Sequence, residues 1–168
     1  MTQMMDARMR AFLQGEAVLA DLFELSREEL YELAGQGHTL YYAGQLDSAR
    51  TIFEGLTALD PTDSFFHSGL GVIYQHQGAL ERAVIEYDRA LALNEQDIPA
   101  RCNRAEVLLQ QGRTEAALQD LERISELDPT AQCSHTLRAR SIALTLLSML
   151  RELDEQRQPP SPSGRGRG

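Results

Sequence analysis

The chain has 168 residues, of which 42% are hydrophobic, and its formal net charge is −9. This length and apolar fraction suit one globular domain with tails. The acidic balance argues against general nucleic-acid binding, which needs surplus basic surface to displace counterions. No run approaches the roughly 18 apolar residues of a membrane-spanning helix, so the sequence predicts none. The first residues lack the basic start and apolar stretch of a secretion signal, so we expect a cytoplasmic protein.

The residue types also argue against catalysis. Cys102 and Cys133 lack the spacing of metal ligands and are expected to be free thiols. No nucleophile elbow, phosphate-binding glycine loop or dinucleotide fingerprint occurs, and Glu81, Glu86 and Asp120 are expected to face solvent. We therefore expect no enzymatic activity, no metal and no cofactor.

Residues 1–25 carry apolar side chains at helical spacing. Two stripes are formed by Met5, Met9, Phe12 and Leu13, and then by Leu19 and Leu22. Terminal units of a repeat stack must hide their open face, so this segment is expected to be a helical cap. A methionine-rich apolar helix is also an adaptable contact surface, so a homodimer interface is the equally weighted alternative.

Ser26 and Glu29 have the spacing of a capping box, in which each side chain accepts a hydrogen bond from the other residue's amide. A helix is therefore predicted to begin at about Arg27 and to run into the segment that follows.

Residues 26–131 repeat with a period of 34. Glycines stand at one position of this period and alanines five residues later; they are Gly44, Gly78 and Gly112, and Ala49, Ala83 and Ala117. Glycine permits the left-handed backbone that ends a helix, and apolar residues on each side of it recur at spacings near 3.6. The sequence therefore predicts three stacked helical hairpins at about 30–63, 64–97 and 98–131.

Two segments follow the hairpins. Residues 132–157 are predicted to form a C-terminal capping helix. Residues 158–168 are rich in proline, glycine and serine and are expected to be disordered. The predicted fold class is all-α, a solenoid of three helical hairpins with flanking helices at both ends.

The hairpins resemble the tetratricopeptide repeat over Leu30 to Gln132. The resemblance is carried by a small residue in the first helix, a large one in the second, and the position where the repeat usually has tryptophan. These positions hold Gly37, Gly71 and Ala105, then Phe53, Tyr87 and Leu121, and lastly Leu33, His67 and Arg101 in place of tryptophan.

A longer pattern joins the N-terminal segment to the repeats. It runs from Phe12-Leu13 through Glu29-Leu30-Tyr31-Glu32-Leu33-Ala34 and Gly69-Leu70-Gly71 to Ala105-Glu106-Val107-Leu108-Leu109. From Phe12 to Leu121 the chain resembles the class II chaperones of bacterial type III secretion, the cytosolic partners of the pore-forming translocator proteins. The resemblance implies a holding chaperone that binds a secreted translocator as an extended segment. Ala34 departs from the pattern, since this family often has tyrosine there.

First helices of stacked hairpins line a concave groove with positions 2, 5, 9 and 12 of each repeat. These positions hold Tyr31, Ala34, His38, Tyr41, Phe65, Ser68, Val72, Gln75, Pro99, Cys102, Glu106 and Leu109. Three helices about 8–10 Å apart span roughly 20 Å, which fits about six residues of extended peptide. The resemblance places Tyr41 on a groove tyrosine of the family, and a partly buried packing role is the alternative.

Other repeat functions fit less well. Repeat proteins that dock acidic C-termini need a cationic cluster, whereas this groove is expected to offer only Asn103 and Arg104. RNA-reading helical repeats need paired base-reading and cationic side chains, which the groove lacks. A general interaction adaptor in another bacterial assembly or regulatory complex remains the alternative function.

Overall fold

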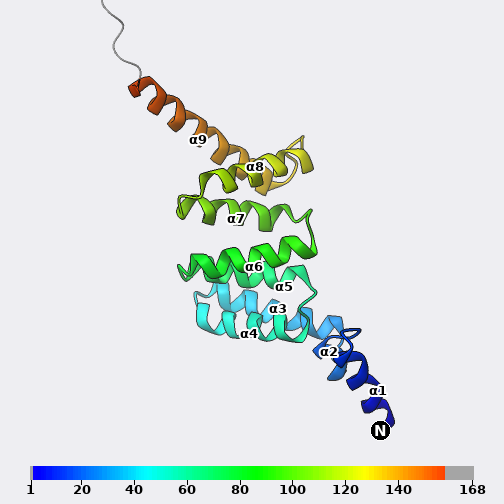
Figure 1. Cartoon of the computed structure of the whole chain (residues 1–168). Coiled ribbons are helices and arrows are strands. Elements are labelled where there is room, and N and C mark those ends of the chain that lie inside the picture. The colour runs from blue at the N-terminus through cyan, green and yellow to red at the C-terminus, as the bar shows by residue number, and fades with distance from the viewer. Residues whose placement is uncertain (1, 158–168) are drawn as a thin grey trace, which may run out of the picture.

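The computed structural model describes residues 2–157, and the side chains of residues 7–156. Within this range the chain forms helices and no strand, which confirms the all-α prediction (Figure 1). The helices are α1 Thr2–Leu13, α2 Leu19–Leu22, α3 Arg27–Tyr42, α4 Leu46–Leu59, α5 Ser64–His76, α6 Leu80–Leu93, α7 Ile98–Gln110, α8 Thr114–Leu127 and α9 Ser134–Arg157. No described helix combines the length and hydropathy that a membrane span requires.

Three helical hairpins form the body of the molecule, as predicted. They pair α3 with α4, α5 with α6 and α7 with α8, and they follow one another along the stack in Figure 1. Gly44, Gly78 and Gly112 turn each first helix into its second helix with φ values of +76°, +73° and +73°. This left-handed conformation strains any residue with a Cβ atom, so the repeated glycine has a backbone role.

Small residues in the first helices make room for rings from the second helices. A Cβ atom on Gly37 would lie 2.7 Å from the Phe53 ring, and one on Gly71 would lie 2.7 Å from the Tyr87 ring. In the third hairpin the small residue is Ala105, and the second helix has a leucine in place of the ring. The consensus positions therefore determine how closely the two helices of each hairpin approach.

Side-chain caps set the start of each first helix. The predicted capping box is present at α3, where Glu29 N donates to Ser26 Oγ at 3.2 Å and Ser26 N donates to Glu29 Oε2 at 2.8 Å. Asp63 accepts from Phe65 N at 2.9 Å at the start of α5, and Asp97 accepts from Ala100 N at 2.9 Å at the start of α7. Each cap satisfies an amide that the helix itself leaves unpaired.

The first turns of α9 continue the stack as the first helix of a fourth unit. Ala139 follows the small residue of the third hairpin by 34 residues and is 2% exposed, and α9 packs against both α7 and α8. Leu146 stands where the period would place the turn glycine, so the helix does not turn back. Its second half extends beyond α8 in Figure 1, with Leu150 and Leu153 exposed.

The N-terminal segment packs on the opposite end of the stack through α2, which contacts α4. Met9 and Leu13 of α1 are exposed, whereas Phe12, Leu19 and Leu22 are half-buried. The Met5 side chain and the predicted disordered tail at 158–168 lie outside the described part of the chain. Because α1 keeps exposed apolar residues, the structure is compatible with both predictions for this segment, a helical cap and a dimer contact.

Candidate functional site

The first helices α3, α5 and α7 present most of the predicted groove residues on neighbouring helices. We call these residues the first-helix face. Tyr31 and Phe65 are exposed, and the half-buried members are His38, Tyr41, Ser68, Val72, Gln75, Glu106 and Leu109.

Two aromatic rings dominate one end of the first-helix face. Tyr31 of α3 stacks on Phe65 of α5 with ring centroids 5.4 Å apart and planes 14° from parallel. Tyr31 is 38% exposed and Phe65 is 39% exposed, although each ring contacts the other and the buried Phe66. The pair offers solvent an apolar surface whose shape is already fixed.

The carboxylate of Asp63 holds this pair in place. It accepts from the Tyr31 hydroxyl at 2.9 Å and from the Phe65 amide at 2.9 Å. Arg27 adds an ion pair to the same carboxylate at 3.0 Å, and its guanidinium carbon lies 5.4 Å from the centre of the Tyr31 ring. Asp63 is 8% exposed, so burial strengthens the bonds that its carboxylate accepts from Tyr31 and Phe65. The Arg27 side chain is 75% exposed, so its ion pair adds less.

The middle of the face is uncharged. His38 packs edge-on against Phe53 at 5.2 Å and tilted against Phe65 at 5.6 Å. Burial lowers the pKa of His38 below its ordinary value, which favours the neutral imidazole. Val72 and Ser68 of α5 continue this surface. An apolar side chain of a ligand would meet no ionised group here.

A second side-chain contact joins α3 to α5, at the end of the first-helix face opposite Tyr31 and Phe65. The Tyr41 hydroxyl lies 3.1 Å from His76 Nε2, and the two rings meet edge to face at 5.1 Å and 88°. His76 Nδ1 lies 3.0 Å from the Val72 carbonyl oxygen, so a proton on Nδ1 leaves Nε2 free to accept from the tyrosine. Burial raises the pKa of Tyr41, which keeps the hydroxyl neutral. The predicted groove residue Tyr41 thus has a partner within the chain and remains half-buried.

Two predicted groove residues belong to the core instead. Ala34 is 1% exposed and Cys102 is 0% exposed, so neither presents a side-chain surface to a ligand. The Cys102 thiol donates to the His135 carbonyl oxygen of α9 at 3.4 Å, and burial raises its pKa. Position 5 of the repeat is therefore buried in the first and third hairpins, whereas in the middle hairpin it is Ser68, a half-buried member of the first-helix face.

The α7 end of the face adjoins α9. Arg138 of α9 forms an ion pair with Glu106 at 2.9 Å and donates to Asn103. Arg104, which we expected at the groove, points to α8 and binds Asp120 at 2.6 and 2.8 Å. That prediction was wrong because a buried carboxylate on the paired helix draws the guanidinium away from the face.

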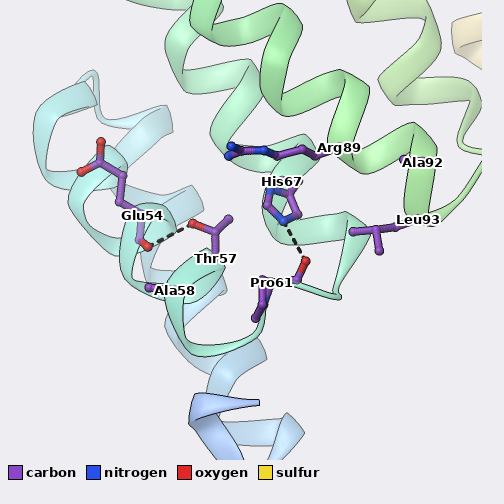
Figure 2. A pocket seen from close by; sticks show the side chains of 8 residues that line it. All are labelled: Glu54, Thr57, Ala58, Pro61, His67, Arg89, Ala92 and Leu93. Carbon is purple, nitrogen blue, oxygen red and sulfur yellow. Dashed lines mark hydrogen bonds between the residues drawn. The ribbon is translucent and has the colours of Figure 1, made fainter. Parts of the chain in front are cut away.

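A separate hollow of about 570 Å³ lies between the second helices α4 and α6 (Figure 2). It is lined by Glu54, Thr57, Ala58, Pro61, His67, Arg89, Ala92 and Leu93. His67 points into the space between the two helices and is itself 4% exposed. Its Nδ1 lies 2.7 Å from Glu86 Oε2, and its Nε2 lies 3.0 Å from the Pro61 carbonyl oxygen.

The expectation that Glu86 and Asp120 face solvent was wrong. They are 7% and 1% exposed, and each is paired with a basic side chain from the first helix of its hairpin. Glu86 pairs with His67, and Asp120 pairs with Arg101 at 3.0 Å. The signal that could have found them is periodic, because the two partners stand 19 residues apart in both hairpins.

The described residues contain no group of three or more histidine, cysteine or acidic side chains arranged to hold a metal ion. Cys102 and Cys133 are free thiols. The arrangement therefore suits a surface that binds another polypeptide, with ordered aromatic rings on one side of the helical stack.

Sequence comparison supports the repeat assignment. The profile of the tetratricopeptide repeat family matches residues 35–98 and, in a second variant, residues 70–141. The low calcium response locus protein H of Yersinia pestis is 31% identical to this chain over 126 residues, which are 75% of each protein.

Solved structures extend the similarity to the fold. A type III secretion system complex from Aeromonas hydrophila contains a chain that is 29% identical, with a TM-score of 0.76, over 86% of this chain and 97% of that one. The Yersinia enterocolitica type III secretion chaperone SycD, in complex with a peptide of the translocator YopD, is 26% identical with a TM-score of 0.63. That match covers 79% of this chain and 98% of SycD.

Proposed function

This chain belongs to the tetratricopeptide-repeat family of type III secretion translocator chaperones, and we propose that its first-helix face holds an extended segment of a secreted translocator. The family is a class of protein-binding chaperones, so the proposed activity is binding without a chemical step. The proposed site of action is the cytoplasm, where the chaperone would hold its client before export.

The observation that carries this proposal is the stacked pair of Tyr31 and Phe65. Both rings are more than a third exposed, yet Asp63 and Arg27 hold them in one arrangement. A rigid aromatic surface binds an apolar side chain without first losing conformational freedom, which favours affinity. Aromatic residues in such positions contribute most of the energy at many protein interfaces.

The rest of the first-helix face suits an extended backbone. His38, Val72 and Leu109 provide neutral or apolar contacts on the first helices α3, α5 and α7. The half-buried Gln75 amide oxygen accepts from the Tyr87 hydroxyl at 2.8 Å, which leaves the amide nitrogen to donate to a peptide carbonyl. We place the client's apolar anchors against the aromatic pair and its backbone along α5.

Holding of this kind requires no nucleotide. Binding lowers the free concentration of the client's exposed apolar segments, and so it reduces their aggregation by mass action. The exposed residues Met9 and Leu13 of α1 add a proposed homodimer contact at the N-terminal end of the stack. That contact does not include the first-helix face.

The proposal is tested by co-purification from the native host. Wild-type chain is expected to recover an apolar secreted protein, whereas Tyr41→Glu is expected to lose it because a charge would be placed beside the client. Leu118→Glu on α8 is the matched control, since Leu118 is 37% exposed on a second helix. Circular dichroism must show equal helical content in all three proteins. Equal recovery with Tyr41→Glu, or recovery of a protein of another class, would favour a general interaction adaptor.

A further inference from the structure

The imidazole of His67 faces a hydrogen-bond acceptor with each of its nitrogens. Nδ1 lies 2.7 Å from the Glu86 carboxylate and Nε2 lies 3.0 Å from the Pro61 carbonyl oxygen. A neutral imidazole carries one N–H and one lone pair, so it can donate to only one of these groups. The imidazolium donates to both. In the neutral ring, a lone pair would face the oxygen atom of the other acceptor.

The third hairpin contains the same arrangement with a permanent cation. Arg101 donates to Asp120 Oδ1 at 3.0 Å and to the Glu95 carbonyl oxygen at 2.8 Å. Each of these three residues lies 34 positions after its counterpart in the middle hairpin. The longer arginine is matched by the shorter aspartate, and the shorter histidine by the longer glutamate. Since arginine stays charged in proteins, the comparison indicates that this arrangement of a carboxylate and a carbonyl oxygen suits a cation. The first hairpin has the apolar residues Leu33 and Ile52 at the corresponding positions and lacks the pair.

The charged groups around His67 come from the helices on either side of it. Glu86 and Arg89 belong to α6, and Arg89 Nη1 donates to Glu86 Oε1 at 2.7 Å. Glu54 of α4 lies across the hollow in Figure 2 and accepts from the Tyr74 hydroxyl at 2.8 Å. The hydrogen bond that His67 donates to Glu86 is the largest effect on the pKa of the ring and raises it, against burial and the charge of Arg89.

His67 also lies close to the first-helix face along the chain. Phe65 precedes it by two residues on α5, and Pro61 belongs to the connection between α4 and α5. The two hydrogen bonds of the imidazolium therefore tie the start of α5 to α6 on one side and to the preceding loop on the other. Phe65 lies two residues before His67, about 200° around the same turn of α5. Asp63 accepts hydrogen bonds from the Phe65 amide and from the Tyr31 hydroxyl.

We propose that His67 is an imidazolium in the folded chain at neutral pH and acts as a proton-dependent positioning residue for Phe65. Loss of the proton removes the bond to Pro61 and loosens the start of α5. The consequence for client binding rests on the proposed function. The protonation of the ring and its effect on Phe65 do not, and they are tested without a client.

The test replaces the middle-hairpin pair by the pair of the third hairpin, in the double variant His67→Arg with Glu86→Asp. Urea unfolding of this variant and of the wild type is compared between about pH 6 and about pH 9. Folding raises the pKa of His67, so its contribution to stability is complete below the unfolded pKa and is lost as the pH rises through the folded pKa. Burial lowers the pKa of His38 and His135, which gives the opposite slope, but both proteins contain them and the comparison cancels their effect.

The unfolding equilibrium constant of the wild type is expected to rise relative to that of the double variant as the pH rises. The rise is about tenfold for each unit by which folding raises the pKa of His67. Nitrogen-15 NMR of the wild type should show protons on both ring nitrogens of His67 at pH 7. The ring signals of Phe65 should move with the same midpoint in the wild type and stay constant in the double variant.

Three results would overturn the proposal. A single protonated ring nitrogen on His67 at pH 7 would contradict the imidazolium, and so would parallel pH profiles of the two proteins. Ring signals of Phe65 that do not change as His67 titrates would contradict the positioning role. If the double variant does not fold, the nitrogen-15 and Phe65 measurements on the wild type decide the question alone.

Discussion

Tyr31 and Phe65, which lie on different helices, are held in register by one shared carboxylate. Asp63 accepts a hydrogen bond from the hydroxyl of the first residue and another from the amide of the second, each at 2.9 Å. The same carboxylate therefore caps α5 and fixes the stacked rings. Stability of the helix and order of the candidate binding surface are coupled at this point, and each can be tested separately.

Phe65→Ala should weaken binding of the client segment by about tenfold or more, because it removes one of two ordered apolar rings. The free energy of unfolding should fall by only about 1 kcal/mol, since the ring is already 39% exposed. Fluorescence anisotropy with the labelled segment measures the binding, and urea unfolding measures the stability.

The matched control for this variant is Leu118→Ala, which removes an apolar side chain of similar exposure, 37%, from α8. Its binding should equal that of the wild type. If both variants weaken binding alike, the client contacts the second helices and the assignment of the first-helix face is wrong.

Gly71→Ala should destabilise the middle hairpin by about 1–3 kcal/mol, because the added methyl group would lie 2.7 Å from the fully buried Tyr87 ring. Gly55→Ala in α4 is the control, since no atom outside its own helix lies within 4 Å of that position. The control should stabilise the chain by about 0.5–1 kcal/mol through helix propensity. Urea unfolding of both variants checks the prediction, and equal effects would show that the close approach of Gly71 to Tyr87 does not limit the packing.

Asp120→Ala should lower the free energy of unfolding by about 3 kcal/mol or more. The carboxylate is 1% exposed and pairs with Arg101 and Arg104, so its removal leaves two partly buried guanidinium groups without their main partner. Glu122→Ala, two residues along α8 and exposed, should change stability by less than about 0.5 kcal/mol. Thermal and urea unfolding would contradict this account if the two variants behaved alike.

Leu13→Asp should reduce the mass of the protein in solution from that of a dimer to that of a monomer. Leu13 is 74% exposed on α1, and a charge at an apolar contact would have to be desolvated on association. Leu144→Asp is the control, because that leucine is 67% exposed on α9 at the other end of the stack. Light scattering measures the mass. If Leu144→Asp alone dissociates the dimer, the dimer contact lies on α9 and not on α1.

Local, periodic features made the fold predictable. Gly44 and its repeats act through the backbone at their own position, and Gly37 acts through the helix paired with its own in the same hairpin. Such features can be recognised in a single sequence because they recur at the same position of each hairpin. The predicted helix over residues 132–157 was a single helix for a related reason: Leu146 stands where the period would place a turn glycine, so nothing in the sequence turns the chain back.

The surroundings of the charged residues were predicted wrongly, although the two buried pairs share a spacing of 19 residues. A carboxylate on a helix is usually solvated, and only a partner on the neighbouring helix reveals that Glu86 is buried. Ala34 shows the same limit at the candidate site, because the repeat position that should face the groove is packed into the core. The binding role of the exposed residues on the first-helix face stays a prediction.

That role is tested most directly by NMR mapping with a synthetic peptide that copies the client segment recovered from the host. We expect the largest changes in the amide and ring signals of Tyr31, Phe65 and Val72, with little change at Thr57 and Ala92 beside the hollow between α4 and α6. The reverse distribution, with shifts concentrated at the hollow and none at the aromatic pair, would contradict the proposal that this chaperone holds its client on the first helices.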